Sequence, residues 1–173
     1  TYPKLSGNRK TYVIGGQHDN SFFKSKGHNI VEAICKERKD LVYRGFFNAQ
    51  FLVKGLMLEI RHPGGGVSYA RSYKMQKIIE NMIGYINSVP TADPPVLEVF
   101  GHWHIPCHLP SYMGVDAVSL PCFQSMTPYL AEKGLMPTVG CAVAEIQLSK
   151  NNQLSSTKIE FIIMNSRVQR RDF

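Results

Sequence analysis

The amino-acid sequence predicts an α/β fold in which strands and helices alternate early and antiparallel strands come last. Short runs of β-branched and aromatic residues recur along the chain, and amphipathic helical segments separate several of them. The last two runs follow one another with only a turn between them. Strands that alternate with helices favour a parallel sheet, so we expect an α/β core with antiparallel additions.

The first half of the chain contains a strand, a helix and three further strands. Residues 11–14 predict a buried strand, because an apolar and aromatic run ends there at a glycine pair. Residues 29–38 predict a helix that Asn29 can cap, with Glu32 three residues later and apolar residues at helical spacing. Further strands are expected at 41–43, 50–53 and 56–60, with Lys54-Gly55 as a hairpin turn.

The second half begins with a loop at His62-Pro63-Gly64-Gly65-Gly66, because proline and three glycines sustain neither regular structure. Residues 69–87 predict a helix with an apolar face made by Tyr73, Ile78, Ile79, Met82, Ile83 and Ile86. Strands are then expected at 96–100, 115–120, 139–148 and 157–164. Asn151-Asn152 predicts the hairpin turn between the last two of these strands.

Composition is that of a soluble globular protein, with 43% hydrophobic and 19% charged residues. No apolar run approaches the ~18–20 residues that a membrane span needs. The four cysteines show no Cys-x-x-Cys spacing, and no apolar signal segment opens the chain, so we expect reduced thiols in the cytoplasm. No linker interrupts residues 1–173, which we expect to form a single domain.

The net charge of +7 is unevenly spread along the chain. Residues 1–77 hold fourteen Lys and Arg against five acids, whereas residues 78–149 hold one against six. A basic half suits a polyanion such as nucleic acid, because phosphate contacts release counterions. The candidate contacts are Arg71, Lys74 and Lys77 on the helix at 69–87, although such a basic face is also typical of a solvated helix surface.

Four histidines follow predicted strands. His18 comes after the strand at 11–14, His62 after the strand at 56–60, and His102 and His104 after the strand at 96–100. Open α/β sheets bind ligands at the carboxyl ends of their strands, where imidazoles from separate strands can share a divalent ion. The alternative interpretation is a set of ordinary surface histidines in loops.

Three short motifs resemble those of the calcineurin-like metallophosphoesterases, in particular phage and prokaryotic members. Gly16-Gln17-His18-Asp19 resembles the family's Gly-Asn-His-Asp motif, and Arg61-His62-Pro63 resembles its lone histidine at a strand end. Gly101-His102-Trp103-His104 matches its Gly-His-x-His motif. The order and spacing agree over most of the chain, and the resemblance implies a metallophosphoesterase-like αββα sandwich with late antiparallel hairpins.

The resemblance also implies a task for each site residue. Gln17 stands where the family has a metal-binding Asn and would bind one ion together with His62 and His102, while His104 would bind a second ion. His18 would be the general acid that protonates the leaving oxygen, steadied by Asp19. The expected cofactor is a divalent transition metal, up to two ions of Mn, Fe or Zn. The expected reaction is hydrolysis of a phosphate ester, with phosphodiesters and nucleic acid among the substrates.

Two motifs of the family, Asp-x-His and Gly-Asp-x-x-Asp, do not occur in this sequence. In the family they supply most ligands of the ion that His104 would bind. The resemblance therefore implies the C-terminal two-thirds of the domain, without its first strand–helix units. Three explanations remain: a fragment, a separate chain that supplies the missing strands, or a catalytically degenerate subunit with a structural or nucleic-acid-binding role. We expect another segment or chain to cover the edge of the strand at 11–14.

Overall fold

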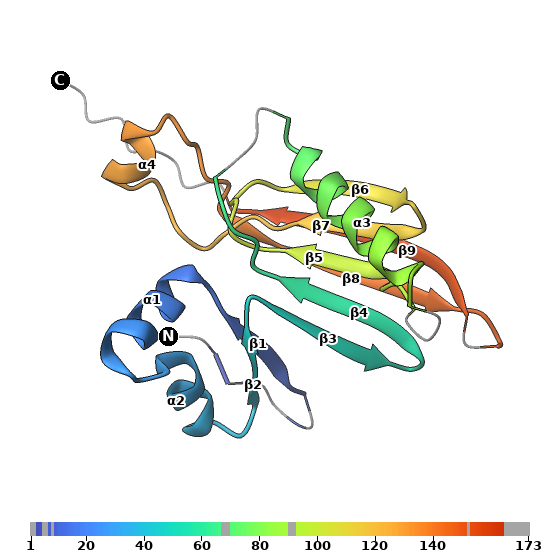
Figure 1. The fold of residues 1–173 in the computed structure, drawn as a ribbon, viewed down its shortest axis with the longest axis horizontal. Coiled ribbons are helices and arrows are strands. Elements are labelled where there is room, and N and C mark those ends of the chain that lie inside the picture. The colour runs from blue at the N-terminus through green and yellow to red at the C-terminus, as the bar shows by residue number, and fades with distance from the viewer. Residues whose placement is uncertain are drawn as a thin grey trace.

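The computed structural model describes residues 3, 4, 7, 9–66, 70–89, 93–151 and 153–164. These residues form a mixed α/β structure around a central five-stranded sheet (Figure 1). The strands of the sheet lie in the order β3 (Asn48–Val53), β4 (Leu56–Arg61), β5 (Leu97–Phe100), β7 (Val115–Ser119) and β6 (Cys107–Tyr112). The predicted α/β class is confirmed at this level.

The three inner strands of the sheet are parallel, whereas β3 and β6 pair antiparallel with them at the two edges. Arg61 at the end of β4 is in register with Phe100, and Phe100 is in register with Ser119 at the end of β7. The carboxyl ends of the inner strands therefore meet at one edge, which is where the sequence places His62 and the segment after residue 100.

A second, two-stranded parallel sheet is made by β1 (Thr11–Gly15) and β2 (Leu41–Phe46). Two helices, α1 (Gln17–Lys26) and α2 (Ile30–Lys36), connect these strands. Within the described residues, β1 pairs only with β2, so its other edge carries no strand. Phe47 joins the two sheets: its N–H donates to the Gly15 carbonyl at 2.9 Å, and its own carbonyl accepts from the His62 N–H at 2.6 Å. The carboxyl ends of β1 and β4 are thereby held together.

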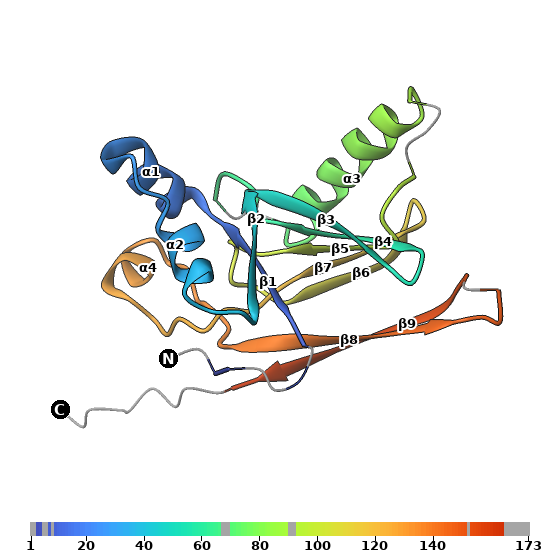
Figure 2. The same cartoon turned by 90° about the horizontal axis from the view of Figure 1, so that it is seen from below.

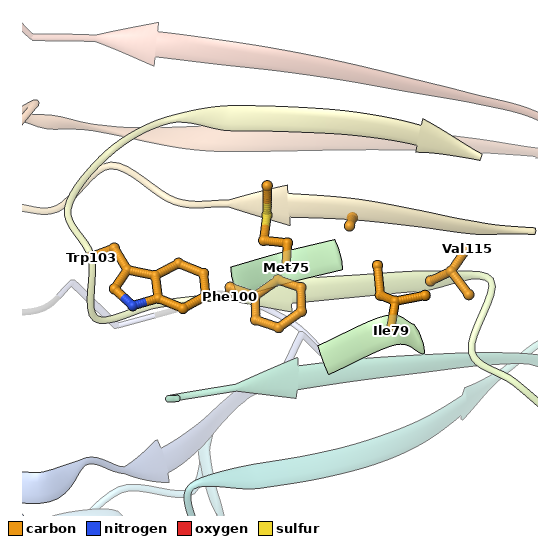
Figure 3. Close-up of a cluster of buried hydrophobic side chains, with 6 residues drawn as sticks. Met75, Ile79, Phe100, Trp103 and Val115 are labelled. Atoms are coloured by element: carbon orange, nitrogen blue, oxygen red, sulfur yellow. The ribbon is translucent and has the colours of Figure 1, made fainter. Parts of the chain in front are cut away.

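Helix α3 (Tyr73–Ile86) covers one face of the five-stranded sheet, and the hairpin of β8 (Gly140–Leu148) and β9 (Leu154–Ile163) lies along the other (Figures 1 and 2). The core under α3 consists of six buried apolar residues: Met75, Ile79, Phe100, Trp103, Val115 and Ala117 (Figure 3). A short helix, α4 (Pro128–Glu132), interrupts the segment between β7 and β8. No helix in the described ranges has both the length and the apolar character needed to cross a membrane.

Most predicted elements are confirmed with shifted ends. The Lys54-Gly55 turn has both residues at positive φ, as a tight hairpin turn requires, and the Asn29 side chain accepts the Glu32 N–H at the start of α2. Asn152 of the second predicted turn lies outside the described residues.

Three elements were not predicted: α1, β6 and α4. The sequence of helix α1 has no apolar stripe that would predict a helix, and none of its residues is buried. Strand β6 pairs with β7 as a hairpin through the tight turn Met113-Gly114, whose residues both have positive φ, and Pro110 within β6 weakens its strand pattern. Helix α4 is only 5 residues long.

The predicted apolar face of α3 was wrong at one end. Tyr73 is 41% exposed, whereas Met75 is fully buried. The face runs through Met75, Ile78, Ile79, Met82 and Ile83, at the three- and four-residue spacing of one helix side. Tyr73 precedes Met75 by two residues, a rotation of about 200° around the helix axis, and so points roughly to the opposite side.

Candidate functional site

Five of the residues singled out from the sequence line one cavity of about 650 Å³: Gln17, His18, His62, His102 and His104. They come from the segments that follow β1, β4 and β5, at the edge where these strands end. The structure thus brings these five side chains from strand ends together in one place. Asp19 lies beside the cavity but does not line it.

Helix α1 begins directly after Gly16, so Gln17 and His18 occupy its first turn. The Asp19 carboxylate accepts the Gly16 N–H at 2.8 Å and closes this turn. Within the described residues, no hydrogen bond joins His18 to Asp19. Asp19 therefore orders the backbone turn that carries His18.

His62 packs against the backbone of Gly16. A Cβ added to Gly16 would lie 2.7 Å from Cε1 and 2.8 Å from Nε2 of the imidazole, so this approach requires glycine. The Nε2 atom of His62 is buried and has no hydrogen-bond partner within the described residues. A buried nitrogen without a partner is costly, and such atoms occur where a ligand or ion is bound.

The loop after β5 brings His102, Trp103 and His104 to the cavity, and of the three Trp103 is also packed in the core. His102 and His104 both have positive φ, at 75° and 59°, which is uncommon for residues other than glycine and occurs at functional sites. Trp103 between them is buried and stacks on Phe100, with ring centroids 5.6 Å apart. The tryptophan anchors the turn in the core, as Figure 3 shows, while both histidines line the cavity.

His102 is held by two neighbours. Its Nε2 lies 2.9 Å from the Gly65 carbonyl, and its ring centroid lies 4.8 Å from that of His62. The glycine loop predicted at residues 64–66 therefore forms one side of the cavity, with Gly65 and Gly66 in the lining.

Burial lowers the pKa of His62, His102 and His104 below that of a free imidazole. For His62 the next cause is the charge that His102 would carry, which also lowers the pKa. Neutral imidazole is the form that binds metals, and three neutral imidazoles at neutral pH are consistent with that chemistry.

The donors fit a divalent transition metal in kind, because imidazole and amide oxygen are suitable ligands and the His62 Nε2 is unpaired. Their arrangement is incomplete. In the ranges that the structure describes, no three His, Cys, Asp or Glu side chains are placed to hold one ion. The His102 Nε2 is also already paired with a carbonyl. Additional ligands are needed before this cavity could hold a metal tightly.

The three basic residues named from the sequence lie at the start of α3. Lys74 donates to the Gly66 carbonyl and so contacts the glycine loop, and Lys77 pairs with Glu80 at 2.7 Å. Arg71 is exposed just before the helix. Two of these three cations thus have partners within the chain.

Two features of the site were missed from the sequence. Arg61, next to His62, is held by the buried carboxylates of Glu59 and Glu98. The cavity lining also contains apolar and aromatic side chains, together with the polar Gln124 and Thr127: Ile105, Tyr129, Leu130, Leu135, Met136 and Pro137. The sequence signal for these apolar lining residues is the apolar content of residues 120–140, which does not follow the pattern of a strand.

The chain matches no protein-family model and no curated protein. Solved structures that resemble it distantly include the following two. Vps29 from Entamoeba histolytica, crystallised with zinc, has a TM-score of 0.43 and 10% sequence identity, over 91% of this chain and 84% of Vps29. The Thermotoga maritima protein TM1076 has a TM-score of 0.40 and 16% identity, over 78% of this chain and 72% of that protein. Likeness at this level carries no information about activity.

Proposed function

We propose that this chain forms most of a calcineurin-like metallophosphoesterase domain and hydrolyses phosphate esters when a preceding segment or a partner chain completes its site. One observation supports the proposal most strongly: Gln17, His18, His62, His102 and His104, from three strand ends, line the same cavity. Surface histidines in unrelated loops would have no reason to converge in this way.

In this proposal the chain supplies donors and a proton. His62, His102 and His104 offer neutral imidazole nitrogens, and Gln17 offers its amide oxygen at the cavity wall. A divalent metal held there would polarise the phosphoryl group and activate water. His18, in the first turn of α1, would donate a proton to the leaving oxygen.

The test is a set of histidine variants made in the complete assembly, purified from its own source. His62→Ala should reduce bound transition metal, measured by elemental mass spectrometry, because it removes a buried donor. His18→Ala should keep the metal and reduce hydrolysis of an alkyl phosphate ester by about 10²–10⁴-fold, the usual contribution of a general acid.

His28→Ala is the matched control, because His28 is exposed and does not line the cavity. It should leave metal content and turnover unchanged. Full activity of His18→Ala on the alkyl ester would refute the role of His18. Absence of any metal-dependent hydrolysis by the assembly would refute the proposed function.

A second candidate function is a non-catalytic subunit that binds nucleic acid. A specific observation favours it: a pocket of about 370 Å³ near the amino ends of β1 and β2 is lined by five cations, Lys4, Arg9, Lys10, Arg38 and Lys39. Only Glu37 and Asp40 oppose them in the lining, and Asp40 pairs with Arg38 at 2.6 Å. The pocket therefore carries a formal charge of +3, five cations less two acids, which suits phosphate.

This candidate predicts binding of a single-stranded oligonucleotide that weakens with salt and is insensitive to EDTA. Lys39→Glu should weaken the binding by roughly tenfold, about 1.4 kcal/mol, because it reverses one charge of the pocket. Lys133→Glu is the matched control, because Lys133 is exposed and does not line this pocket. Binding that requires a metal, or that both variants weaken equally, would exclude this pocket.

A further inference from the structure

We propose that the histidine cavity binds a small phosphate ester whose leaving group is apolar, rather than the backbone of a nucleic acid. This inference rests on the proposed function and names its substrate class. The observation behind it is the mixed lining of the cavity, in which histidines and Gln17 are accompanied by apolar side chains. Four of these apolar residues, which we call the apolar wall, come from one loop together with Tyr129 and the polar Gln124 and Thr127: Leu130, Leu135, Met136 and Pro137.

The apolar wall is a closed loop of residues 122–138. The Cys122 N–H donates to the Thr138 carbonyl at 2.9 Å, and the Gly140 N–H donates to the Cys122 carbonyl at 2.8 Å, which brings the loop ends together. The Thr138 N–H also donates to the His104 carbonyl at 2.9 Å. The loop is therefore tied to the segment that presents His102 and His104, and its apolar side chains are placed relative to them.

The loop has internal order as well. The Thr127 hydroxyl accepts the Leu130 N–H and caps α4, Leu130 is buried, and the Leu135 N–H donates to the Leu130 carbonyl at 2.9 Å. Two of the apolar side chains with which the loop lines the cavity remain largely in solvent: Tyr129 is 64% exposed and Met136 is 82% exposed. Apolar side chains held at the rim of a polar site can be covered by the apolar part of a ligand.

The charges around the cavity argue against a polymeric phosphate. No Lys, Arg, Asp or Glu is among the described residues that line it. Lys74 is outside the lining but contacts it, because its ammonium donates to the carbonyl of Gly66. Successive phosphates of a nucleic acid require several cations along their path, and one lysine beside the cavity does not supply them.

The size of the cavity agrees with a single small ligand. Its volume of about 650 Å³ lies within the ~300–1,000 Å³ that small-molecule sites usually enclose. An aromatic phosphate ester could place its ring on the wall of Tyr129 and Met136 and its phosphate toward the histidines. Burial of the ring would contribute binding free energy in proportion to the apolar area removed from water.

The test uses two probes of equal charge, phenyl phosphate and methyl phosphate, titrated into the full chain. Trp103 is the only tryptophan and lines the cavity, so its fluorescence reports binding. We expect phenyl phosphate to bind about tenfold more tightly than methyl phosphate, or more, because of the additional apolar area. The neutral probe 4-methylphenol should bind and compete with phenyl phosphate.

Tyr129→Ser and Met136→Ser should each weaken phenyl phosphate binding several-fold and leave methyl phosphate binding unchanged. Both side chains are largely exposed, so neither change should prevent folding. Tyr85→Ser is the matched control, because Tyr85 is 69% exposed on α3 and does not line the cavity. It should have no effect on either probe.

Equal affinities for the two phosphates, or equal effects of Tyr129→Ser and Tyr85→Ser, would overturn the inference. So would concentration-dependent self-association that Tyr129→Ser abolishes, since a second copy would then cover the wall. Retained preference for phenyl phosphate without hydrolysis in the complete assembly would support the inference and refute the proposed function. Hydrolysis of both phosphates without any preference for phenyl phosphate would support the proposed function and refute the inference.

Discussion

At the scale of single residues, the site depends on one glycine and on one buried tryptophan between two histidines. Gly16 lets the His62 ring approach the start of α1, and Trp103 turns inward so that His102 and His104 can turn outward. The two positive-φ histidines are stabilised by the buried tryptophan and by the Gly65 carbonyl. The geometry of the cavity is therefore set by packing around the histidines as much as by the histidines themselves.

Gly16→Ala should destabilise the protein by about 1–3 kcal/mol, the usual cost of forcing an extra carbon into a packed contact. The new Cβ would lie under 3 Å from the His62 ring, so either the ring or α1 must move. Urea unfolding would measure the loss. Gly84→Ala is the matched control, because nothing lies within 4 Å of its Cβ position on α3. It should stabilise the protein by about 0.5–1 kcal/mol, and a similar gain for Gly16→Ala would contradict the packing argument.

At the scale of elements, local capping and long-range contact act together. Asn29 caps α2 by accepting the Glu32 N–H at 3.2 Å, and its amide donates to the Tyr43 hydroxyl on β2 at 2.9 Å. One side chain thus ends the preceding loop, starts the helix and fixes the helix to the strand. The cap was predictable from the sequence, whereas the contact with Tyr43 was not.

Asn29→Ala should lower the free energy of unfolding by about 1–2 kcal/mol, because it removes the cap and the bond to Tyr43. Asn81→Ala, at an exposed position inside α3, should be neutral or slightly stabilising, since alanine is the better helix former. Thermal unfolding of both variants would measure the contrast. Equal stability of the two variants would show that the cap contributes nothing.

At the scale of the whole molecule, two sheets meet at the cavity, and a charge cluster with buried carboxylates lies within the larger sheet. Arg61 donates to Glu98 at 2.6 Å and also to Glu59, whose other oxygen accepts from Gln50 at 2.9 Å. This cluster crosses β3, β4 and β5. Glu98 is fully buried, its Oε2 has no partner within the described residues, and burial raises its pKa above the ordinary value, against the opposing effect of Arg61.

A raised folded-state pKa means that the folded protein binds the Glu98 proton more tightly than the unfolded chain does. The contribution of Glu98 to stability is therefore fully present below the ordinary value of 4.5 and is lost as the pH rises through the folded-state pKa. Urea unfolding between pH 4 and 8 should show wild type gaining stability relative to Glu98→Gln as the pH falls. Glu132→Gln, an exposed control on α4, should show no such trend. A gap that instead widens in favour of wild type at high pH would contradict the assignment.

Sequence by itself determined the α/β class, most strands, α2, α3, the Lys54-Gly55 turn and the strand-end positions of the four cavity histidines. These features depend on local periodicity, capping and turn chemistry, which neighbouring residues encode. Tertiary structure alone decided the fit of His62 against Gly16, the inward Trp103, the Arg61 cluster and the apolar loop that faces the histidines. Each of these joins segments far apart in the chain, and such contacts form only when the strands pair and bring their carboxyl ends to one edge.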